Sequence, residues 1–282
     1  MISFKAEKIP YRIECDADSS NCIFPYVRKD TGLYSIQCIS PIHGRSFVLC
    51  AEKNGQWIIG KGNGLSYTTH SFVLTSPIFA ETWGGLSLDN AVRDFNIGNE
   101  VRSLGIKTNL MQYVLSIDAN IIKNGEKCQA ALLQYSVECP YRITDFGFIP
   151  KHILKRTIAK WGNKYQQKHL HAAFVLVNNL RILHEHKVLH NAMHPQNYTW
   201  ALELLDFEAS RSIKYPYNNT EYEAYVPMLS EAEVIQTYEI INYIAWCLGE
   251  KPNYIAIENI FRDNGFRLKE LQLKAGALSI GN

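Results

Sequence analysis

One stretch of the chain, residues 188–208 with the sequence VLHNAMHPQNYTWALELLDFE, carries the side chains best suited to chemistry. It contains a polar loop, 190–197, and then an alternating apolar segment, 198–205, which predicts a half-buried strand ending at Asp206. The amide oxygen of Asn197 and the carboxylate of Asp206 are hard oxygen ligands of the kind that Mg²⁺ or Mn²⁺ takes beside phosphates. The stretch therefore predicts a metal site that serves a phosphate-bearing substrate.

The order of these residues matches a protein-kinase catalytic loop, which reads H-x-D-x-x-x-x-N, a strand and then D-F-G. His190 and Asn197 keep the spacing of that loop, and Asp206-Phe207 keeps its D-F pair. Ala192 stands where a kinase has its catalytic Asp, and a methyl group cannot accept a proton. The pattern therefore indicates a kinase-like loop that retains its metal ligands and has lost its base.

A literal D-F-G triplet, Asp145-Phe146-Gly147, lies elsewhere in the chain. It comes before the polar loop, whereas the metal-binding acid has to follow the loop, so Asp206 is preferred. Within the loop, His190 is expected to bond the backbone. His194 is open to two interpretations, a surface residue or a general base.

Three charged residues outside this stretch are candidates for holding a nucleotide. Lys61 ends an apolar run inside Gly60-Lys61-Gly62-Asn63-Gly64, where the amides of Gly62 and Gly64 and the ammonium group could reach phosphates. Asp94 lies on a predicted helix and could pair with Lys61, and Arg142 could clamp a phosphate through two hydrogen bonds. Taken singly, each of the three also fits a solvated surface charge.

The first half of the chain reads as strands with one helix. Strands are expected at 33–39, 46–52, 56–60, 109–118 and 127–137, with turns at Asn54-Gly55 and Asn124-Gly125. The expected helix covers 88–104, with Ser87 as its N-cap and Gly105 as its stop. Its apolar face would comprise Val92, Phe95, Val101 and Leu104.

The second half reads as helices. They are expected at 150–161, 165–186, from a capping box Ser230-x-x-Glu233 to about Gly249, at 254–262 and at 268–273, with a loop at 215–225. A polar segment, 138–147, separates the two halves. We therefore expect an α+β, two-lobed protein-kinase-like fold: a strand-rich N-lobe (1–137), a hinge (138–147) and a helical C-lobe (148–282).

Composition narrows the function classes. The chain has 282 residues, 46% of them hydrophobic, and a net charge of +2, which argues against nucleic acid or an anionic membrane as partner. No apolar run reaches membrane-spanning length and the first residues lack a signal core, so a cytoplasmic location is expected. Seven Cys with no C-x-x-C pair predict reduced thiols, and the oligomeric state stays open.

Taken together, these motifs resemble the selenoprotein O family, pseudokinases that transfer AMP from ATP to protein hydroxyls. That family has L-K-G-A-G followed by Tyr, here residues 60–64 with Tyr67; R-E-F and then L-G-I-P-T, here 93–95 and 104–108; and H-G-V-M-N-T-D-N followed by D-Y-G, here 190–197 and 206–208. The resemblance covers about residues 56–146 and 188–208. It also explains Ala192, because the family lacks the usual Asp there.

The resemblance implies an enzyme that uses ATP and Mg²⁺ or Mn²⁺ to place AMP on a Ser, Thr or Tyr of a protein substrate. In it Lys61, oriented by Asp94, holds phosphate charge, Asn197 and Asp206 hold the metal, and Arg142 matches the second Arg of a phosphate-binding pair. The chain departs from the family at Tyr135, where the first Arg is expected, at Gln196, where the family has an acid, and at Asp94, where it has Glu.

Two other functions remain open. The sequence H-x-x-x-H-P-x-N at 190–197 also resembles the H-G-D-L-H-P-G-N loop of small-molecule phosphotransferases, although these need the Asp that Ala192 replaces. A catalytically inactive nucleotide-binding pseudokinase scaffold is the other alternative. Nucleotidyl transfer to protein hydroxyls is the function we expect from the sequence.

Overall fold

The computed structural model describes residues 6–8, 11–16, 26–28, 46–51, 55–62, 85–123, 125–162 and 164–272. The chain forms two compact units. The first unit comprises Met1–Asn99 and Asn109–Pro140, and the second comprises Glu100–Thr108 and Tyr141–Asn282. The expected strand 33–39 lies outside the described residues.

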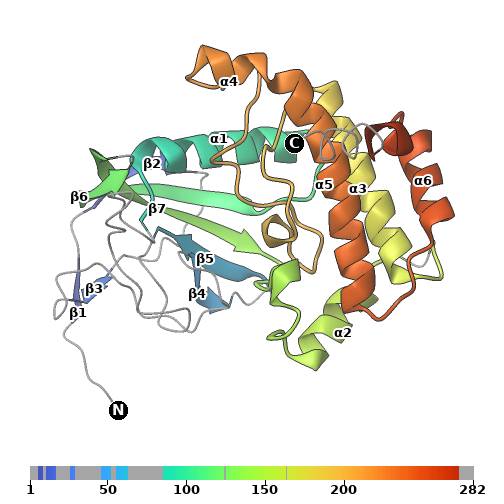
Figure 1. The fold of residues 1–282 in the computed structure, drawn as a ribbon. Coiled ribbons are helices and arrows are strands. Elements are labelled where there is room, and N and C mark those ends of the chain that lie inside the picture. Colours follow the sequence, from blue (N-terminus) through green and yellow to red (C-terminus); the bar gives the residue numbers. More distant parts are fainter. Residues whose placement is uncertain are drawn as a thin grey trace. The chain divides into compact units, whose positions relative to one another are not determined.

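The first unit is built on a five-stranded antiparallel sheet with strand order β2-β6-β7-β5-β4 (Figure 1). Its strands are β2 (Tyr11–Asp16), β4 (Ser46–Ala51), β5 (Trp57–Lys61), β6 (Leu110–Lys123) and β7 (Glu126–Val137). A separate two-stranded sheet pairs β1 (Ala6–Lys8) with β3 (Tyr26–Arg28). The four strands expected at 46–52, 56–60, 109–118 and 127–137 are confirmed, while β1, β2 and β3 were not predicted.

Glycines permit both turns that the sequence predicted in this sheet. β6 and β7 pair up to Lys123 and Glu126, so a two-residue connection joins them, and Gly125 has a φ of 80°. β4 and β5 form the expected hairpin, but their pairing stops at Ala51 and Trp57, which leaves a longer connection than a two-residue turn. Gly55 in that connection has a φ of 83°, a conformation that favours glycine.

The core of the first unit gathers on β6 and β7, the two longest strands of the sheet. Tyr113, Leu115 and Ile117 alternate along β6 and pack with Ala130 and Leu132 of β7. Residues between them, such as Val114, are also buried, so β6 is covered on both faces. This is the environment that β-branched and aromatic residues suit, and it explains why these strands were readable from the sequence.

α1 (Leu88–Ser103) lies where the helix 88–104 was expected. The Ser87 hydroxyl accepts a hydrogen bond from the amide of Asn90, and Gly105 ends the helix with a φ of 85°. The buried face differs from the expected one: Phe95 and Val101 are buried as expected, whereas Val92 and Leu104 are only half-buried. Buried members of the face that were not predicted are Ala91, Asp94 and Ile97.

The second unit is helical (Figure 1). Its helices are α2 (Lys151–Ala159), α3 (Lys168–Glu185), α4 (Thr220–Ala224), α5 (Val226–Cys247) and α6 (Tyr254–Asp263), with short 3-10 turns η2 (Ile143–Asp145) and η3 (Pro195–Asn197). Residues 268–272 are also helical, as expected. No helix in the described part of the chain is both long and apolar enough to span a membrane.

Three local predictions in the second unit are wrong. Residues 198–205 form no continuous strand, because the chain reverses there: Tyr198 pairs with Leu204, and the Thr199 amide donates to the Glu203 carbonyl at 3.0 Å. A buried bond from the Thr199 hydroxyl to the Glu203 carboxylate, 2.8 Å, holds the reversal. Alternating polarity cannot distinguish one strand from two short arms of a hairpin.

The other two errors concern the start of α5. The expected loop 215–225 contains α4, whose N-cap Asn219 accepts from the amides of Glu221 and Tyr222. The Ser230-x-x-Glu233 pattern does not cap a helix, because α5 begins earlier, at Val226, and has proline in its first turn. Ser230 and Glu233 therefore lie inside α5, where their side chains serve tertiary contacts.

The division into a strand-rich first unit and a helical second unit is confirmed. The order of the elements is that of a protein-kinase-like α+β fold: an antiparallel sheet, a helix whose acid pairs with a strand lysine, a loop carrying Asn197, and a later acid followed by Phe207.

Candidate functional site

A buried ion pair joins Lys61 and Asp94 in the first unit. The Lys61 Nζ lies 2.6 Å from Oδ2 of Asp94, and both side chains are at most 2% exposed. A single buried charge without a partner costs several kcal/mol, typically about 3–5, so each residue requires the other. The pairing that the sequence allowed is present, and the alternative of two solvated surface charges is excluded.

The sheet and α1 bring this pair together. Lys61 ends β5 opposite Leu133 of β7, at the centre of the sheet, and Asp94 lies on the buried face of α1. Gly62 follows with a φ of 91°, and an added Cβ there would lie 2.6 Å from the Ala131 carbonyl oxygen. Glycine is therefore required for packing at this position. Gly64 lies outside the described residues.

His190 holds the loop of the second unit from inside. Its ring is fully buried, and Nε2 donates to the Leu205 carbonyl at 2.7 Å. Ser210 donates to the His190 carbonyl at 3.0 Å, and the Phe207 ring packs edge-on against the imidazole. These contacts connect the start of the loop with the segment around Asp206. The prediction that His190 bonds the backbone is therefore confirmed.

Asn197 is nearly buried at the end of the same loop. Its Nδ2 donates to the Ala192 carbonyl at 2.9 Å, which fixes the side-chain amide and leaves Oδ1 as the acceptor atom. Oδ1 receives only a long contact, 3.4 Å, from Nη1 of Arg142. A fixed amide oxygen of this kind suits a hard cation.

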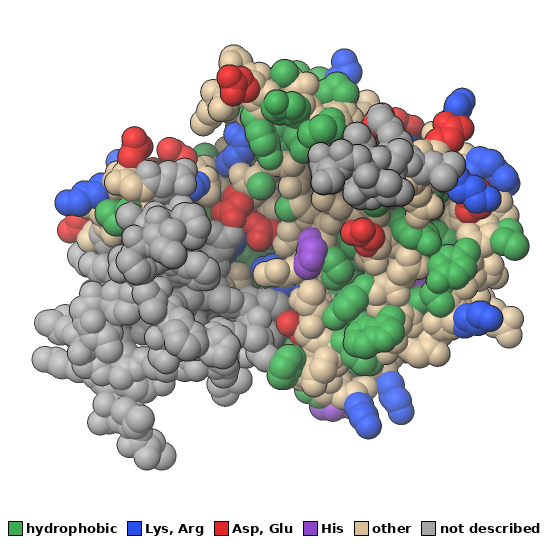
Figure 2. Space-filling view, in the orientation of Figure 1, with side chains coloured by type: hydrophobic (Ala, Val, Ile, Leu, Met, Phe, Trp, Pro, Cys, Tyr) green, Lys and Arg blue, Asp and Glu red, His purple; other side chains and the backbone are tan. Residues whose placement is uncertain are grey.

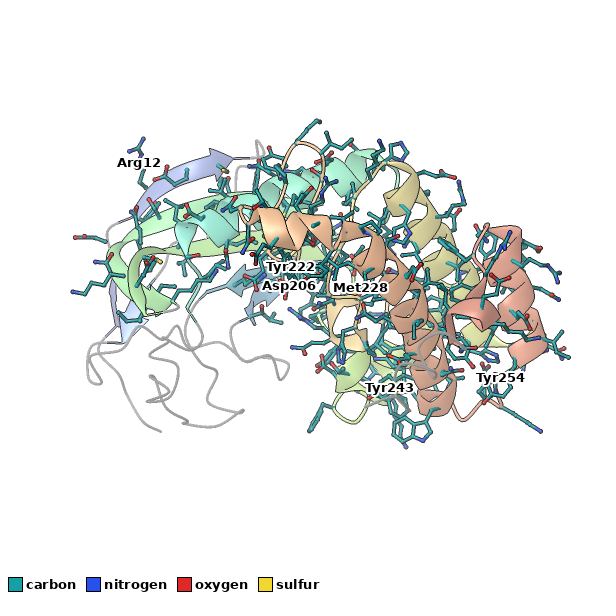
Figure 3. All side chains as sticks on the ribbon, turned by 45° about the horizontal axis from the view of Figure 1, so that its top comes forward. Arg12, Asp206, Tyr222, Met228, Tyr243 and Tyr254 are labelled. Atoms are coloured by element: carbon teal, nitrogen blue, oxygen red, sulfur yellow. The ribbon has the colours of Figure 1, made fainter. Side chains whose placement is uncertain are left out.

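Asp206 is brought next to this loop by the backbone. The Leu205 amide donates to the Asn197 carbonyl at 2.8 Å, so the residue before Asp206 is bonded directly to Asn197. Asp206, which is labelled in Figure 3, is half-buried. Its φ of 69° is a left-handed conformation that Asp tolerates better than most residues. The two expected metal ligands therefore lie in adjacent backbone segments of one unit.

Arg142 is buried against the loop. Its Nη1 donates to the Gln196 carbonyl at 2.9 Å, in addition to the contact with Asn197. Arg142 as a whole residue is 4% exposed. Its backbone amide donates to Oδ2 of Asp145 at 2.7 Å. The guanidinium group is thus occupied by the loop, and Asp145 is occupied by capping the turn that carries Arg142.

No side chain in the loop 190–197 is positioned as a general base that is free of other hydrogen bonds. Ala192 has no titratable group, and Nδ1 of the exposed His194 accepts from the Gln196 amide at 3.2 Å, which makes His194 the N-cap of η3. Burial raises the pKa of the neighbouring Tyr198 hydroxyl far above its ordinary value, so it stays neutral at physiological pH. The loop 190–197 therefore offers no side chain placed like the catalytic Asp of a kinase.

Glu233 is a site residue that the sequence did not reveal. From inside α5 its Oε1 accepts from the Asn191 amide at 2.6 Å, and Oε2 lies 2.8 Å from Nε2 of His184. Asn191 has a φ of 59°, so this buried carboxylate stabilises the loop where its backbone is strained. The sequence did contain a signal, because Glu233 is an acid within a mainly apolar helix. The capping-box pattern offered a local explanation for this acid, so no tertiary contact was predicted for it.

The donor set fits a metal held jointly with a substrate. In the described ranges no group of three or more His, Cys, Asp or Glu side chains could hold a metal ion. The candidate ligands are instead one amide and one carboxylate, and Mg²⁺ in phosphate chemistry takes a few protein oxygens and completes its shell with phosphate and water. Asn197 and Asp206 match that arrangement.

The positions that depart from the family pattern lie in different settings. Tyr135, which stands where the first phosphate-binding Arg was expected, is buried in β7, whereas Gln196 is exposed in η3. Asn63 and Tyr67 lie outside the described residues.

Comparison with protein-family models gives no match, and no curated protein matches the chain. Among solved structures, a Stt7 homologue from Micromonas algae, from a crystal soaked with ATP, is 11% identical, with 78% of this chain and 75% of that chain covered and a TM-score of 0.43. The Toxoplasma gondii specific rhoptry antigen kinase domain is 11% identical, with coverages of 82% and 81% and a TM-score of 0.38. The narrower likeness to the selenoprotein O family stays a prediction.

Proposed function

We propose that the protein binds ATP with Mg²⁺ or Mn²⁺ and transfers AMP to a Ser, Thr or Tyr hydroxyl of a protein. The observation that carries the proposal is the combination of a buried Lys61–Asp94 pair with a kinase-like loop that keeps Asn197 and Asp206 and has Ala192 in place of the base. This set of groups can hold phosphate and metal, but the position of the kinase base, Ala192, carries no titratable group.

The reaction balances without a protein base. The substrate hydroxyl oxygen forms a bond to the α-phosphorus, the bond between that phosphorus and the bridging oxygen breaks, pyrophosphate leaves, and the hydroxyl proton passes to solvent. Phosphoryl-type transition states are loose and need little proton abstraction. The missing base therefore reduces the rate without preventing the reaction.

Each residue has a defined task in this proposal. Lys61, oriented by Asp94, balances phosphate charge. Asn197 and Asp206 would supply oxygens to the metal, and the bound metal would supply positive charge for the leaving pyrophosphate. Arg142 is assigned a different task from the phosphate clamp expected from the sequence. Because its guanidinium is bonded to Gln196 and Asn197, it orients the metal ligand.

The decisive experiment uses ATP labelled at the α- or the γ-phosphate, with Mg²⁺ or Mn²⁺, the protein alone and added protein acceptors. We expect α-label, and not γ-label, to become covalent, with AMP found on a hydroxyl residue by mass spectrometry. Asp206→Asn should lower the transfer rate by roughly 100- to 1000-fold, the usual effect of losing one charge-stabilising group. Asp263→Asn, an exposed Asp in the same unit, is the matched control.

The alternatives give different results. Covalent γ-label would identify phosphate transfer to a protein or small molecule. Metal-dependent ATP binding in calorimetry without transfer of either label would identify an inactive scaffold, which the loss of the base at Ala192 favours. Absence of binding, or binding that does not need metal, would contradict the assignment of Asn197 and Asp206.

A further inference from the structure

A cavity of about 290 Å³ opens on the second unit, and none of its lining residues is assigned to nucleotide or metal. Its apolar lining comes from the end of the segment before the loop and from the first turn of α5: Val188, Leu189, Val226 and Pro227. Val188 and Leu189 are buried, whereas Val226 and Pro227 reach the surface. The cavity therefore has an apolar interior and an open side.

The polar groups around the cavity are basic. His184, Lys187 and Arg211 line it together with Ser230, and no acidic residue does so. Arg211 is neutralised by Glu223 and also donates to the Lys187 carbonyl, and His184 contacts Glu233. Lys187 is exposed and forms no ion pair with any residue that the structure describes. Its ammonium group is thus the charge available to a ligand.

The cavity is small for a ligand site. Its volume of about 290 Å³ lies at the lower end of the range for pockets that enclose small molecules, about 300–1,000 Å³, and is enough for one or two apolar side chains of a larger ligand. Tyr225 and Met228 do not line the cavity, but they flank Val226 and Pro227 in the chain and are 52% and 57% exposed. Apolar side chains gather over α4 and the start of α5, where Figure 3 labels Tyr222 and Met228 (Figures 2 and 3).

We propose that this cavity is a docking site for an extended peptide segment of a protein partner. An apolar side chain of the segment fills the cavity, and an acidic residue beside it pairs with Lys187. Charge complementarity selects such a segment over a basic one, because like charges at an interface cost several kcal/mol. The inference rests on the proposed function only in treating the partner as the protein that receives AMP.

The position of the cavity in the chain connects docking with the loop. Leu189 and Arg211 are paired through both backbone bonds, at 2.9 and 2.8 Å, and His190 follows directly. His184, on the cavity wall, contacts the carboxylate of Glu233 that holds Asn191. A segment bound here is therefore held beside the start of the loop, at His190 and Asn191.

The test measures peptide binding to the full chain by fluorescence anisotropy, without nucleotide or metal. The probes are fluorescein-labelled heptapeptides with Leu, Ile or Phe followed by two Glu, and the same peptides with two Lys. We expect the acidic set to bind and the basic set to bind at least about tenfold more weakly. Because no ATP is present, this result is independent of whether AMP is transferred.

Two variants locate the site. Lys187→Glu should weaken binding of the acidic peptides by about tenfold. Val226→Asp should do the same from the apolar side, and an acid in the first turn of α5 suits a helix N-terminus, so this variant should fold. Lys155→Glu, an exposed residue of α2 that does not line the cavity, is the control and should bind like wild type.

Three outcomes would overturn the proposal. The first is equal binding of acidic and basic peptides, and the second is binding that neither cavity variant changes. The third is that no peptide binds, while octanoate changes the tyrosine fluorescence of the wild type and not that of Val226→Asp. The last would identify a site for a small carboxylate.

Discussion

Asp145 and Asp206 each directly precede a phenylalanine, as Asp94 also does, and the structure gives the first two different environments. Asp145 is buried and accepts from the Arg142 amide, so it stabilises a turn. Asp206 is half-buried and follows a residue bonded to Asn197. The same D-F pair thus occurs in two roles. Asp145 makes a structural contact, whereas Asp206 lies beside the candidate metal ligand Asn197.

Asp145→Ala and Asp206→Asn should therefore have opposite effects. Asp145→Ala leaves a buried amide without its acceptor, so the free energy of unfolding in urea should fall by about 1–3 kcal/mol while metal-dependent ATP binding stays within a few-fold of wild type. Asp206→Asn should keep stability, because Asn tolerates a φ of 69°, and should lose that binding in calorimetry. The reverse pattern would show that Asp145 is the metal ligand.

At the scale of elements, β5 is the feature that places Lys61, and the turn after it constrains the sequence. Gly55 and Gly62 lie before and after β5 with φ values of 83° and 91°. They differ in their surroundings: a Cβ at Gly55 would meet nothing within 4 Å, whereas one at Gly62 would lie 2.7 Å from the Leu86 Cβ as well as close to Ala131. The two positions form a matched pair.

Alanine at these positions should separate backbone strain from steric overlap. Gly55→Ala should cost about 1–2 kcal/mol, the penalty for a left-handed conformation. Gly62→Ala should cost about 1–3 kcal/mol more, because overlap with backbone cannot be relieved by rotating a side chain. Urea denaturation of both variants gives the comparison. Equal losses would mean that the sheet adjusts around Gly62 and that packing there is not restrictive.

At the scale of the whole molecule, acid stability depends on contacts that tie helices together within a unit. Glu250 follows α5 and accepts from the amides of Lys168 and His169 at the start of α3, each at 2.9 Å, and from the His169 ring at 2.7 Å. Burial by itself raises the pKa of Glu250, but these hydrogen bonds and the charge of His169 outweigh it, so the pKa is lowered from 4.5.

The lowered pKa predicts a specific pH dependence. Stability from ionised Glu250 is fully present above its unfolded pKa of about 4.5 and is lost as the pH falls through the lower folded value. The difference in Tm between wild type and Glu250→Gln should be positive at pH 7 and should shrink below about pH 4.5. Glu185→Gln, which removes an exposed pair with Arg181, should change Tm little at either pH. A difference that does not vary with pH would contradict the role of the charge.

Much of the fold was readable from the sequence because its signals are local. Ser87 and Gly105 delimit α1 through bonds to residues within one turn, and Gly125 permits the tight connection between β6 and β7. The kinase-like order of Asn197 and Asp206 could also be read from the sequence. Only the short segment 198–205 lies between them, so its length fixes their spacing along the chain. Such features depend on neighbouring residues and survive without knowledge of the rest of the chain.

Features decided by distant contacts could not be read in this way. Lys61 and Asp94 lie 33 residues apart, and only the packing of α1 on the first unit excluded two solvated charges. Glu233 matched a local capping pattern, yet its carboxylate serves Asn191, 42 residues away, because α5 begins one turn earlier than the pattern implied. The reversal at 198–205 has the alternation of a strand and is decided by the buried Thr199–Glu203 bond. Local sequence thus determined the elements and the types of groups available for chemistry, while burial, which makes each unpaired charge costly, decided which of those groups are partners.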